Sequence, residues 1–293
     1  MSALADREAA AFETHRHALL GLAYRMLGSR AEADDVVQDA YLRWHATDPG
    51  EIDEPRRYLK TVVARLCLDR LKSAQARREL YVGQWLPEPV VDETFDAESA
   101  SDLAHDLSVA LMLTLERLSP LERAAFLLHD VFDLDFAEVA RALDRQEAAC
   151  RQLASRAREH IKAGRPRFPT SPEEGRRLAA AFRQAAEVGD AQALTELLAG
   201  DAVLYSDGGG KRPAALNPIR GADKILRFLA GVARKNPSLP AMQARAATIN
   251  GLAGFVTREP DGAINTMAFE HHAGRIVAIY LVRNPEKLRH VRF

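Results

Sequence analysis

The stretch LDRQEAACRQLASRAREHIKAGRPR (residues 143–167) concentrates positive charge in a chain whose charges otherwise nearly cancel. From Arg145 onward it holds seven Lys or Arg residues against two Glu, whereas the whole 293-residue chain has a net charge of −1. On a helix that advances 100° per residue, one side of this segment is apolar and the other is cationic. The apolar side, which we expect to pack on a preceding helix, consists of Ala149, Cys150, Leu153, Ala154, Ala157 and Ile161.

The cationic side carries the residue types that read DNA. It consists of Arg151, Gln152, Ser155, Arg158 and Lys162, with Arg156 at its edge. Arg and Gln make paired hydrogen bonds to base edges in the major groove, and a small Ser allows close approach. Arg158 and Lys162 lie further along and suit phosphates. A solvated helix usually interleaves acidic partners, and this side offers only Glu159, so we predict a DNA-binding helix.

Helix-start signals place a second helix directly before this one. Asp135-Phe136-Ala137-Glu138 has the form of a capping box, as Ser119-Pro120-Leu121-Glu122 does one helix earlier. The short apolar helix at residues 136–143 is separated from the basic helix only by Asp144-Arg145-Gln146. Two helices joined by a tight turn, the second rich in Arg, predict a helix-turn-helix.

Two further blocks of charge lie upstream. Between Arg56 and Arg78 the only acid is Asp69, and between Glu88 and Asp106 there are seven acids and no Lys or Arg. The pattern favours two polyanion-binding surfaces joined by a segment that repels polyanions, although three solvated faces would look the same. Residues 80–102 are expected to form this linker. Within it, WLPEPVV is an apolar patch that needs a surface to rest on.

The periodicity divides the chain into two all-α domains followed by an α+β domain. Apolar stripes at three- and four-residue spacing predict helices before Gly28, over Val36–Trp44 and after Pro55. The last third predicts helices at Pro172–Val188, Asp190–Leu198 and Gly221–Lys235, then strands, with hairpin turns at residues 259–262 and 272–274. The predicted domain boundaries are 1–79, 80–102 for the linker, 103–165 and 172–293.

Composition excludes several classes of protein. No segment has the charge-free apolar length of a membrane span, and the polar, acidic N-terminus lacks the apolar core of a signal peptide. We therefore expect a cytoplasmic protein. Cys67 and Cys150 are expected to be buried thiols, which build neither a disulfide framework nor a metal site. The GGGK run is no phosphate-binding loop, because that motif would require Gly where Tyr205 stands and Ser or Thr where Arg212 stands.

Three segments resemble the domains of extracytoplasmic-function sigma factors. LSPLERAAFLLHDVFDLDFAEVARALDRQEAACRQLASRAREHI (Leu118–Ile161) is similar to the sigma-4 domain. AYRMLGSRAEADDVVQDAYLRW (Ala23–Trp44) and PRRYLKTVVARLCLDRLKSAQARRE (Pro55–Glu79) are similar to the sigma-2 domain. One departure is that Arg65-Leu66 replaces the usual Arg-Asn pair, so a base contact is not carried over to position 66.

The resemblance implies that the protein binds core RNA polymerase and promoter DNA and directs transcription initiation without a cofactor. Contacts to the polymerase clamp are implied for Asp34, Asp35, Gln38, Asp39 and Trp44. Contacts to the −10 element, held by backbone charge and stacking, are implied for Tyr58, Lys60, Arg65, Arg70, Lys72, Arg77 and Arg78. Contacts to the −35 element are implied for Arg151, Gln152, Ser155, Arg156 and Arg158. The acidic linker would follow the RNA exit path.

Three short motifs resemble one subgroup of this family, in which a SnoaL-like cone of the ketosteroid-isomerase type follows the sigma domains. They are WLPEP (Trp85–Pro89), DGGGK (Asp207–Lys211) and NPEKL (Asn284–Leu288). We expect the cone to dock on the linker and the sigma-2 domain and to regulate the protein from within. The interface residues are predicted to be Trp85, Leu86, Pro87, Asp207, Gly208, Gly209, Gly210, Lys211, Asn284, Pro285, Lys287 and Leu288.

Two alternatives remain open from the residues alone. An enzyme could use Tyr205, Asp207, His271 or His272 for proton transfer in the cone. However, three glycines follow Asp207, and a flexible loop is a poor support for a catalytic base. Adjacent histidines on a strand point to opposite faces, so at most one of them can face a cavity. A helix-turn-helix regulator with a ligand-sensing cone would leave the basic Arg56–Arg78 segment without a role. An unknown small ligand of the cone is compatible with either reading.

Overall fold

Apolar stripes bury one side of each N-terminal helix in the computed structural model, as the sequence predicted. The structure describes residues 2–47, 52, 54–78, 81–92, 109–164, 171–235 and 242–293. Helix α1 (Ser2–Leu27) ends at Gly28, whose φ of +71° suits glycine. Helix α2 (Arg30–His45) starts where the Ser29 side chain accepts from the Glu32 amide, and α3 (Pro55–Arg78) starts at a proline.

The next helices confirm both predicted capping boxes. They are α5 (Val109–Leu115), α6 (Pro120–Phe126), a π-helical turn η2 (Leu127–Val131), α7 (Phe136–Leu143) and α8 (Glu147–Gly164). Ser119 and Glu122 cap α6 reciprocally, and Asp135 and Glu138 do the same for α7. Asp144, with φ of +53°, turns the chain between α7 and α8. The predicted helix-turn-helix is therefore present.

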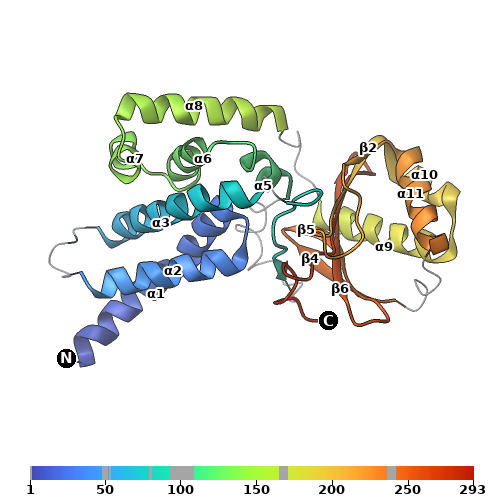
Figure 1. Ribbon diagram of the computed structural model, residues 1–293, viewed down its shortest axis with the longest axis horizontal. Coiled ribbons are helices and arrows are strands. Elements are labelled where there is room, and N and C mark those ends of the chain that lie inside the picture. The colour runs from blue at the N-terminus through green and yellow to red at the C-terminus, as the bar shows by residue number, and fades with distance from the viewer. Residues whose placement is uncertain are drawn as a thin grey trace. The chain divides into compact units, whose positions relative to one another are not determined.

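The two helical domains form a single unit, residues 1–80 and 110–165. Within it, α3 contacts both α6 and α7, and α8 lies along α6 and α7 (Figure 1). Both free cysteines, Cys67 and Cys150, are buried in this unit, as expected. Burial raises the pKa of both thiols.

The second unit contains residues 81–109 and 166–293, so the described part of the predicted linker, residues 81–92, belongs to the same unit as the C-terminal domain. Its sheet has the strand order β1-β4-β5-β6-β7-β2-β3, and among these described strands only the β2–β7 pair is parallel. The strands are β1 (Val91–Asp92), β2 (Leu198–Asp207), β3 (Ile219–Arg220), β4 (Gln243–Ile249), β5 (Leu252–Arg258), β6 (Ile264–His272) and β7 (Arg275–Val282).

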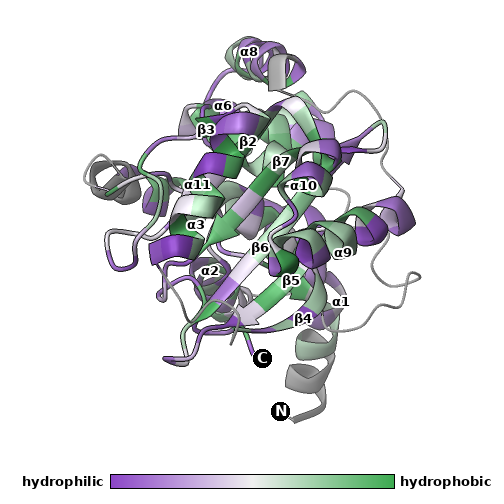
Figure 2. Cartoon of the chain, turned by 90° about the vertical axis from the view of Figure 1, so that its right-hand side faces the viewer, coloured by the Kyte–Doolittle hydropathy of each residue, from purple (hydrophilic) through white to green (hydrophobic). Residues whose placement is uncertain are grey.

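Three helices cover one face of this sheet: α9 (Pro172–Val188), α10 (Ala191–Leu197) and α11 (Ala222–Lys235). Figure 2 shows that α9 and α11 each carry a hydrophobic and a hydrophilic side. The hydrophobic sides form a core with strand residues such as Leu204, Phe269 and Ile279. The next residues along these strands, Tyr205 and Tyr280, are cross-strand partners of one another and point to the second face of the sheet. The α+β class is confirmed.

The predicted turns at residues 259–262 and 272–274 connect β5 to β6 and β6 to β7, as expected. Strand β4 was not predicted, and neither was its turn into β5. Asn250-Gly251 makes that turn with φ values of +48° and +75°, which is the geometry that favours Asn-Gly in two-residue hairpins. In the described part of the chain, no helix is long and apolar enough to cross a membrane, and no cluster of His, Cys, Asp or Glu is arranged to hold a metal ion.

Candidate nucleic-acid interface and linker-binding site

The predicted reading side of α8 faces solvent. Arg151, Gln152, Ser155 and Arg156 are exposed, whereas Cys150, Ala154, Ala157 and Ile161 are buried on α6 and α7. The structure therefore confirms the division of the helix into two sides. What the exposed side binds stays a prediction.

Two arginines of α8 are held by neighbours within the same unit. Arg151 pairs with Glu147 at 2.7 Å and lies 5.3 Å from the centroid of the Phe136 ring. Arg158 pairs with Asp130 of η2 at 2.7 Å, and its side chain is 38% exposed. Arg156 has no such acid within ion-pair distance among the described residues. Arg151 and Arg158 are thus partly preoriented, and their charges are partly neutralised.

Most of the residues of α2 that are predicted to bind the polymerase are accessible, but Trp44 is not. Asp34, Asp35 and Gln38 are exposed, and Arg70 of α3 pairs with Asp35 at 3.5 Å and with Asp39 at 3.0 Å. Trp44 is only 6% exposed, and its ring lies 6.2 Å from that of Tyr58. In this conformation Trp44 belongs to the core, and Arg70 is engaged with the acids of α2.

Several cations of α3 contact the helix-turn-helix domain. Lys60, which is 3% exposed, donates to the Phe132 carbonyl oxygen at 2.6 Å. Burial, followed by the nearby Arg56 charge, lowers the pKa of Lys60 to about 8. Arg65 donates to the carbonyl oxygens of Arg141 and Ala142, at the negative end of the α7 dipole.

A charge pair completes this contact. Arg57 lies 2.7 Å from Glu138, whose carboxylate is also the acceptor of the α7 capping box. Arg57 was not among the residues predicted to contact the −10 element. Tyr58 is half-buried beside Thr47, and Lys72 is exposed next to Asp69. The side chains of Arg77 and Arg78 lie outside the described residues.

In the C-terminal unit, Asp207 is the centre of the linker contact. Its carboxylate is fully buried and accepts from the Tyr81 hydroxyl at 2.6 Å, the Leu86 amide at 2.9 Å and the Gly209 amide at 3.0 Å. Burial and then the hydrogen bond to Asp207 raise the pKa of Tyr81, which therefore stays protonated as a donor. The expectation of a loose support for Asp207 was wrong, because β-sheet pairing and these donors fix it.

Lys287 binds the same linker residue, Leu86, from the other side, and we call Asp207 and Lys287 together the linker clamp. Its ammonium lies 2.8 Å from the Asp207 carboxylate and 2.5 Å from the Leu86 carbonyl oxygen. The rings of Tyr81 and Trp85 flank it, with centroids 4.9 Å and 4.4 Å away. Cation–π contacts of this kind are stronger when desolvated, and the Lys287 side chain is 13% exposed. Asp207 and Lys287 thus bind the two main-chain groups of Leu86 while neutralising one another.

The glycines of DGGGK are required by close approach rather than by mobility. A Cβ on Gly209 would lie 2.2 Å from the Asn284 side chain, and one on Gly210 would lie 3.1 Å from Val82. Both residues also have positive φ. Asn284 donates in turn to the Tyr81 hydroxyl. Lys211, predicted to contact the linker, pairs instead with Glu286 on the surface. The three motifs therefore meet at one place, but through Asp207 and Lys287 rather than Lys211.

The linker continues over the second face of the sheet and ends in the two-residue strand β1 at the edge. Leu86, Pro87 and Pro89 line a small cavity together with Ile249, Thr266, Ala268, Tyr280 and Val282. His290 binds the Pro89 carbonyl oxygen at 2.8 Å and pairs with Glu88 at 3.0 Å. The main-chain amide of Val90 donates to the side-chain oxygen of Asn250, and the main-chain amide of Asn250 donates to the Val90 carbonyl oxygen. Strand β1 then pairs with β4.

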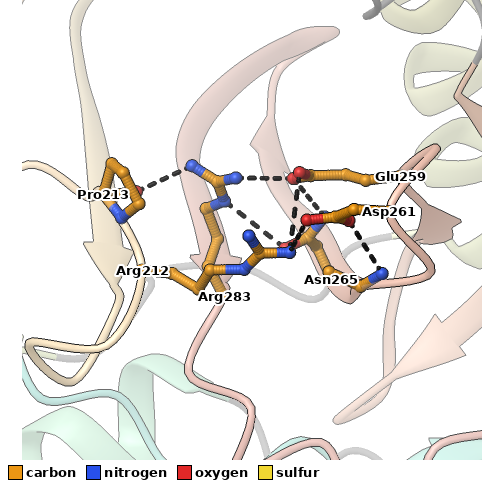
Figure 3. A network of polar contacts seen from close by, with 7 residues as sticks. Arg212, Pro213, Glu259, Asp261, Asn265 and Arg283 are labelled. Carbon is orange, nitrogen blue, oxygen red and sulfur yellow. Dashed lines mark hydrogen bonds and ion pairs between the residues drawn. The ribbon is translucent and has the colours of Figure 1, made fainter.

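A polar network supports the loop that follows DGGGK. Figure 3 shows Arg212 and Arg283 directed at the acids of the β5–β6 hairpin. Arg283 pairs with Glu259 and donates to the Pro213 carbonyl oxygen at 2.7 Å, and Arg212 pairs with Asp261 at 2.7 Å. The network fixes the chain directly after Lys211, and Asn284, the next residue after Arg283, lies beside Gly209.

Of the candidate catalytic residues, Tyr205 and Asp207 lie two residues apart on β2, but His271 is remote from Asp207. Asp207 pairs with Val282 and His271 pairs with Ile276, six residues apart on β7, or about 20 Å along the strand. His271 is buried against Ser171 and Glu174, while His272 is exposed, so the prediction that at most one of them faces inward is confirmed. Asp207 is occupied by the linker and by Lys287.

Sequence reasoning missed three residues of the linker site: Tyr81, Asn250 and His290. Asn250 had a usable signal, because Asn-Gly between two apolar alternating runs marks a hairpin at the sheet edge. Tyr81 and His290 had none. A single aromatic four residues before Trp85, or a histidine near the end of the chain, has no local pattern.

Comparison with known proteins gives consistent matches. Residues 11–77 match the family described as Sigma-70 region 2, and residues 108–161 match Sigma-70, region 4. The ECF RNA polymerase sigma factor SigJ of Mycobacterium tuberculosis is 40% identical over 96% of this chain and 93% of its own length. A probable ECF sigma factor from the same organism, SigI, is 32% identical over 98% and 97%. The crystal structure of SigJ aligns with a TM-score of 0.80 at 37% identity, covering 96% of this chain and 98% of the other.

Proposed function

Since the chain belongs to the extracytoplasmic-function RNA polymerase sigma factors, which bind core polymerase and promoter DNA and direct transcription initiation, we propose roles for its individual surfaces and for its C-terminal domain. The exposed acids of α2 contact the polymerase. The cations of α3, with Tyr58, bind the melted −10 strand, and the exposed side of α8 reads the −35 element. The cone acts as a regulatory domain without turnover.

The observation that carries the assignment of α8 is its exposed row of Arg, Gln and Ser on the second helix of a capped helix-turn-helix. The test of the whole proposal is run-off transcription with purified core polymerase across a library of genomic promoters. The protein is expected to bind core without DNA and to initiate from paired −35 and −10 elements. Binding to an operator without any affinity for core would instead indicate a helix-turn-helix regulator.

A series of alanine substitutions in α8 is expected to distinguish residues that contact bases from residues that contact phosphates. Arg151→Ala and Arg156→Ala are expected to lower −35-dependent transcription and to relax preference at one base position, at a cost of about 1–3 kcal/mol each. Arg158→Ala is expected to weaken binding to all sequences alike. Competition binding with single-base variants of the −35 element measures both effects. If Arg158→Ala alters sequence preference while Arg151→Ala does not, the roles of the two residues are reversed.

The contacts of α3 with the helix-turn-helix domain lead to a second expectation. Lys60 and Arg65, which we assign to the −10 element, and their neighbour Arg57 bind acceptors of the sigma-4 domain in this conformation, so DNA would compete with these contacts. Glu138→Gln keeps an acceptor for the α7 cap and removes one of the two carboxylates paired with Arg57, while Glu54 stays at 2.8 Å. It is expected to raise affinity for a single-stranded −10 oligonucleotide about two- to fivefold, because partly exposed pairs contribute up to about 1 kcal/mol.

The matched control for this variant is Glu122→Gln. Glu122 occupies the same capping-box position on α6, where its carboxylate bonds to Ser119. Fluorescence anisotropy of a labelled strand compares both variants with the unmodified chain. Equal affinities for Glu138→Gln and Glu122→Gln would show that the pair does not compete with DNA.

We further propose that the linker clamp regulates the protein from within, and that the cone also docks on the sigma-2 domain. Tethering gives the linker an effective concentration in the millimolar range at the cone, so even weak contacts are occupied. The buried polar groups at Asp207 support a specific contact rather than an accidental one.

A further inference from the structure

The second face of the cone recognises the linker as a peptide-binding domain recognises an extended peptide. Val91 and Asp92 pair as strand β1 with the edge strand β4, Leu86, Pro87 and Pro89 line a small cavity over the sheet, and Tyr81 and Trp85 flank Lys287. Main-chain bonds at a sheet edge supply affinity in this mode, and pockets for side chains supply specificity. The binding surface therefore has its own recognition chemistry, which does not depend on the segment being covalently attached.

The recognised features can be read from the contacts. Position 86 must offer both main-chain groups, since Asp207 and Lys287 bind its amide and its carbonyl. Positions 81 and 85 must be aromatic to flank the Lys287 ammonium, and position 81 must also donate from a hydroxyl. Leu86 is fully buried in the groove.

The prolines fit the same reading. Pro87 and Pro89 have no N–H, so neither leaves an unpaired amide against the apolar face formed by Ile249, Ala268 and Val282. The next amide, that of Val90, is bound by the Asn250 side chain. The His290 ring donates from Nε2 to the Pro89 carbonyl oxygen, and its Nδ1 lies 3.0 Å from the Glu88 carboxylate. Tyr-x-x-x-Trp-Leu-Pro-x-Pro is thus the complement of the groove.

We infer that the cone is a peptide-recognition module, and that an extended segment of another polypeptide carrying this pattern can replace the linker on it. The occupant is a protein segment with two aromatic anchors and a Leu-Pro step. Its arrival would release residues 81–92 from the clamp. This inference rests on the contacts within the C-terminal unit and holds whether or not the promoter contacts are assigned correctly.

The test uses the synthetic peptide YVGQWLPEPVVD, labelled at its C-terminus, and the full chain in two forms. One form is unmodified. The other, called the emptied chain, carries Tyr81→Ala, Trp85→Ala and Leu86→Ala, which remove the linker side chains that occupy the binding site. Fluorescence anisotropy is expected to show saturable binding to the emptied chain. Binding to the unmodified chain should be at least about tenfold weaker, because the tethered segment competes at millimolar effective concentration.

Two controls locate the binding. A peptide with Ala for Trp85 and Asp for Leu86 should not bind, and adding Asp207→Asn and Lys287→Met to the emptied chain should weaken the parent peptide at least about tenfold. A second emptied chain, with residues 81–92 replaced by Gly and Ser, is included, and circular dichroism confirms that each chain is folded. Equal binding to emptied and unmodified chains, or binding to neither emptied chain, would overturn the inference. Exchange of linkers between two copies, seen as a dimer of the unmodified chain with no peptide binding, would overturn it as well.

Discussion

Lys287→Met is expected to destabilise the C-terminal unit by about 3–5 kcal/mol, the usual cost of removing one partner of a buried ion pair. The substitution keeps the length of the side chain but leaves the fully buried Asp207 carboxylate without its cation. It also removes the donor to the Leu86 carbonyl oxygen and the charge between the Tyr81 and Trp85 rings. Urea unfolding, followed by the fluorescence of Trp85 in a Trp44→Phe background, measures the loss.

The control for this substitution lies in the same set of motifs. Lys211→Met removes a lysine whose pair with Glu286 is half-exposed, with side chains 48% and 51% accessible. Its expected cost is about 0–1 kcal/mol. A much larger loss of stability for Lys287→Met than for Lys211→Met would show that the buried contacts of Lys287 matter, and not merely the removal of a positive charge.

A double-mutant cycle makes the interpretation specific. Asp207→Asn combined with Lys287→Met should cost less than the sum of the single substitutions, because the buried pair is then removed as a whole. Strict additivity would mean that Lys287 acts through packing alone. A cost for Lys287→Met no larger than that for Lys211→Met would contradict the clamp.

The sequence predicted local structure well where a short pattern determines it. The Ser119 and Asp135 capping boxes, the turn at Asp144 and the two sides of α8 depend on residues within one or two helical turns. The structure confirms each of them. The hairpin at residues 259–262 follows for the same reason.

Long-range polar contacts could not be predicted in this way. Lys60 and Arg65 have the composition of a nucleic-acid-binding face, yet their partners are main-chain carbonyl oxygens 72 to 77 residues away. Main-chain acceptors carry no sequence signal. The same reason explains why WLPEP was correctly expected to need a surface, whereas the identity of its donors and acceptors was not foreseen.

The error on DGGGK has a distinct physical cause. Glycine runs usually indicate flexibility, because glycine has the largest backbone entropy. Here the glycines are needed because Asn284 and Val82 approach the backbone too closely for a Cβ. A flexible glycine and a glycine required by close packing look the same in the sequence. They can be distinguished only when the residues that pack against them are known.

Two truncations are expected to change transcription in opposite directions. Ending the chain after Asn284 removes Lys287 and His290, and with them the side chains that bind the linker at residues 86, 88 and 89. The linker should then leave the clamp, and activity should rise or lose its control. Leu288 and Val291, which are removed as well, are buried in the C-terminal unit. Circular dichroism therefore has to show that the truncated chain keeps its sheet.

Deleting the chain from Glu173 onward removes the clamp together with the sheet on which the linker rests. Trp85, Leu86 and Pro87 would then lose the surface that they contact, and an exposed apolar patch of this kind favours non-native contacts. Activity should therefore fall below that of the full chain if the cone also holds a productive arrangement. Affinity for core polymerase and run-off yield, measured side by side for the full chain and both truncations, distinguish these outcomes. Three indistinguishable proteins would show that the C-terminal domain takes no part in initiation, and regulation from within would have to be abandoned.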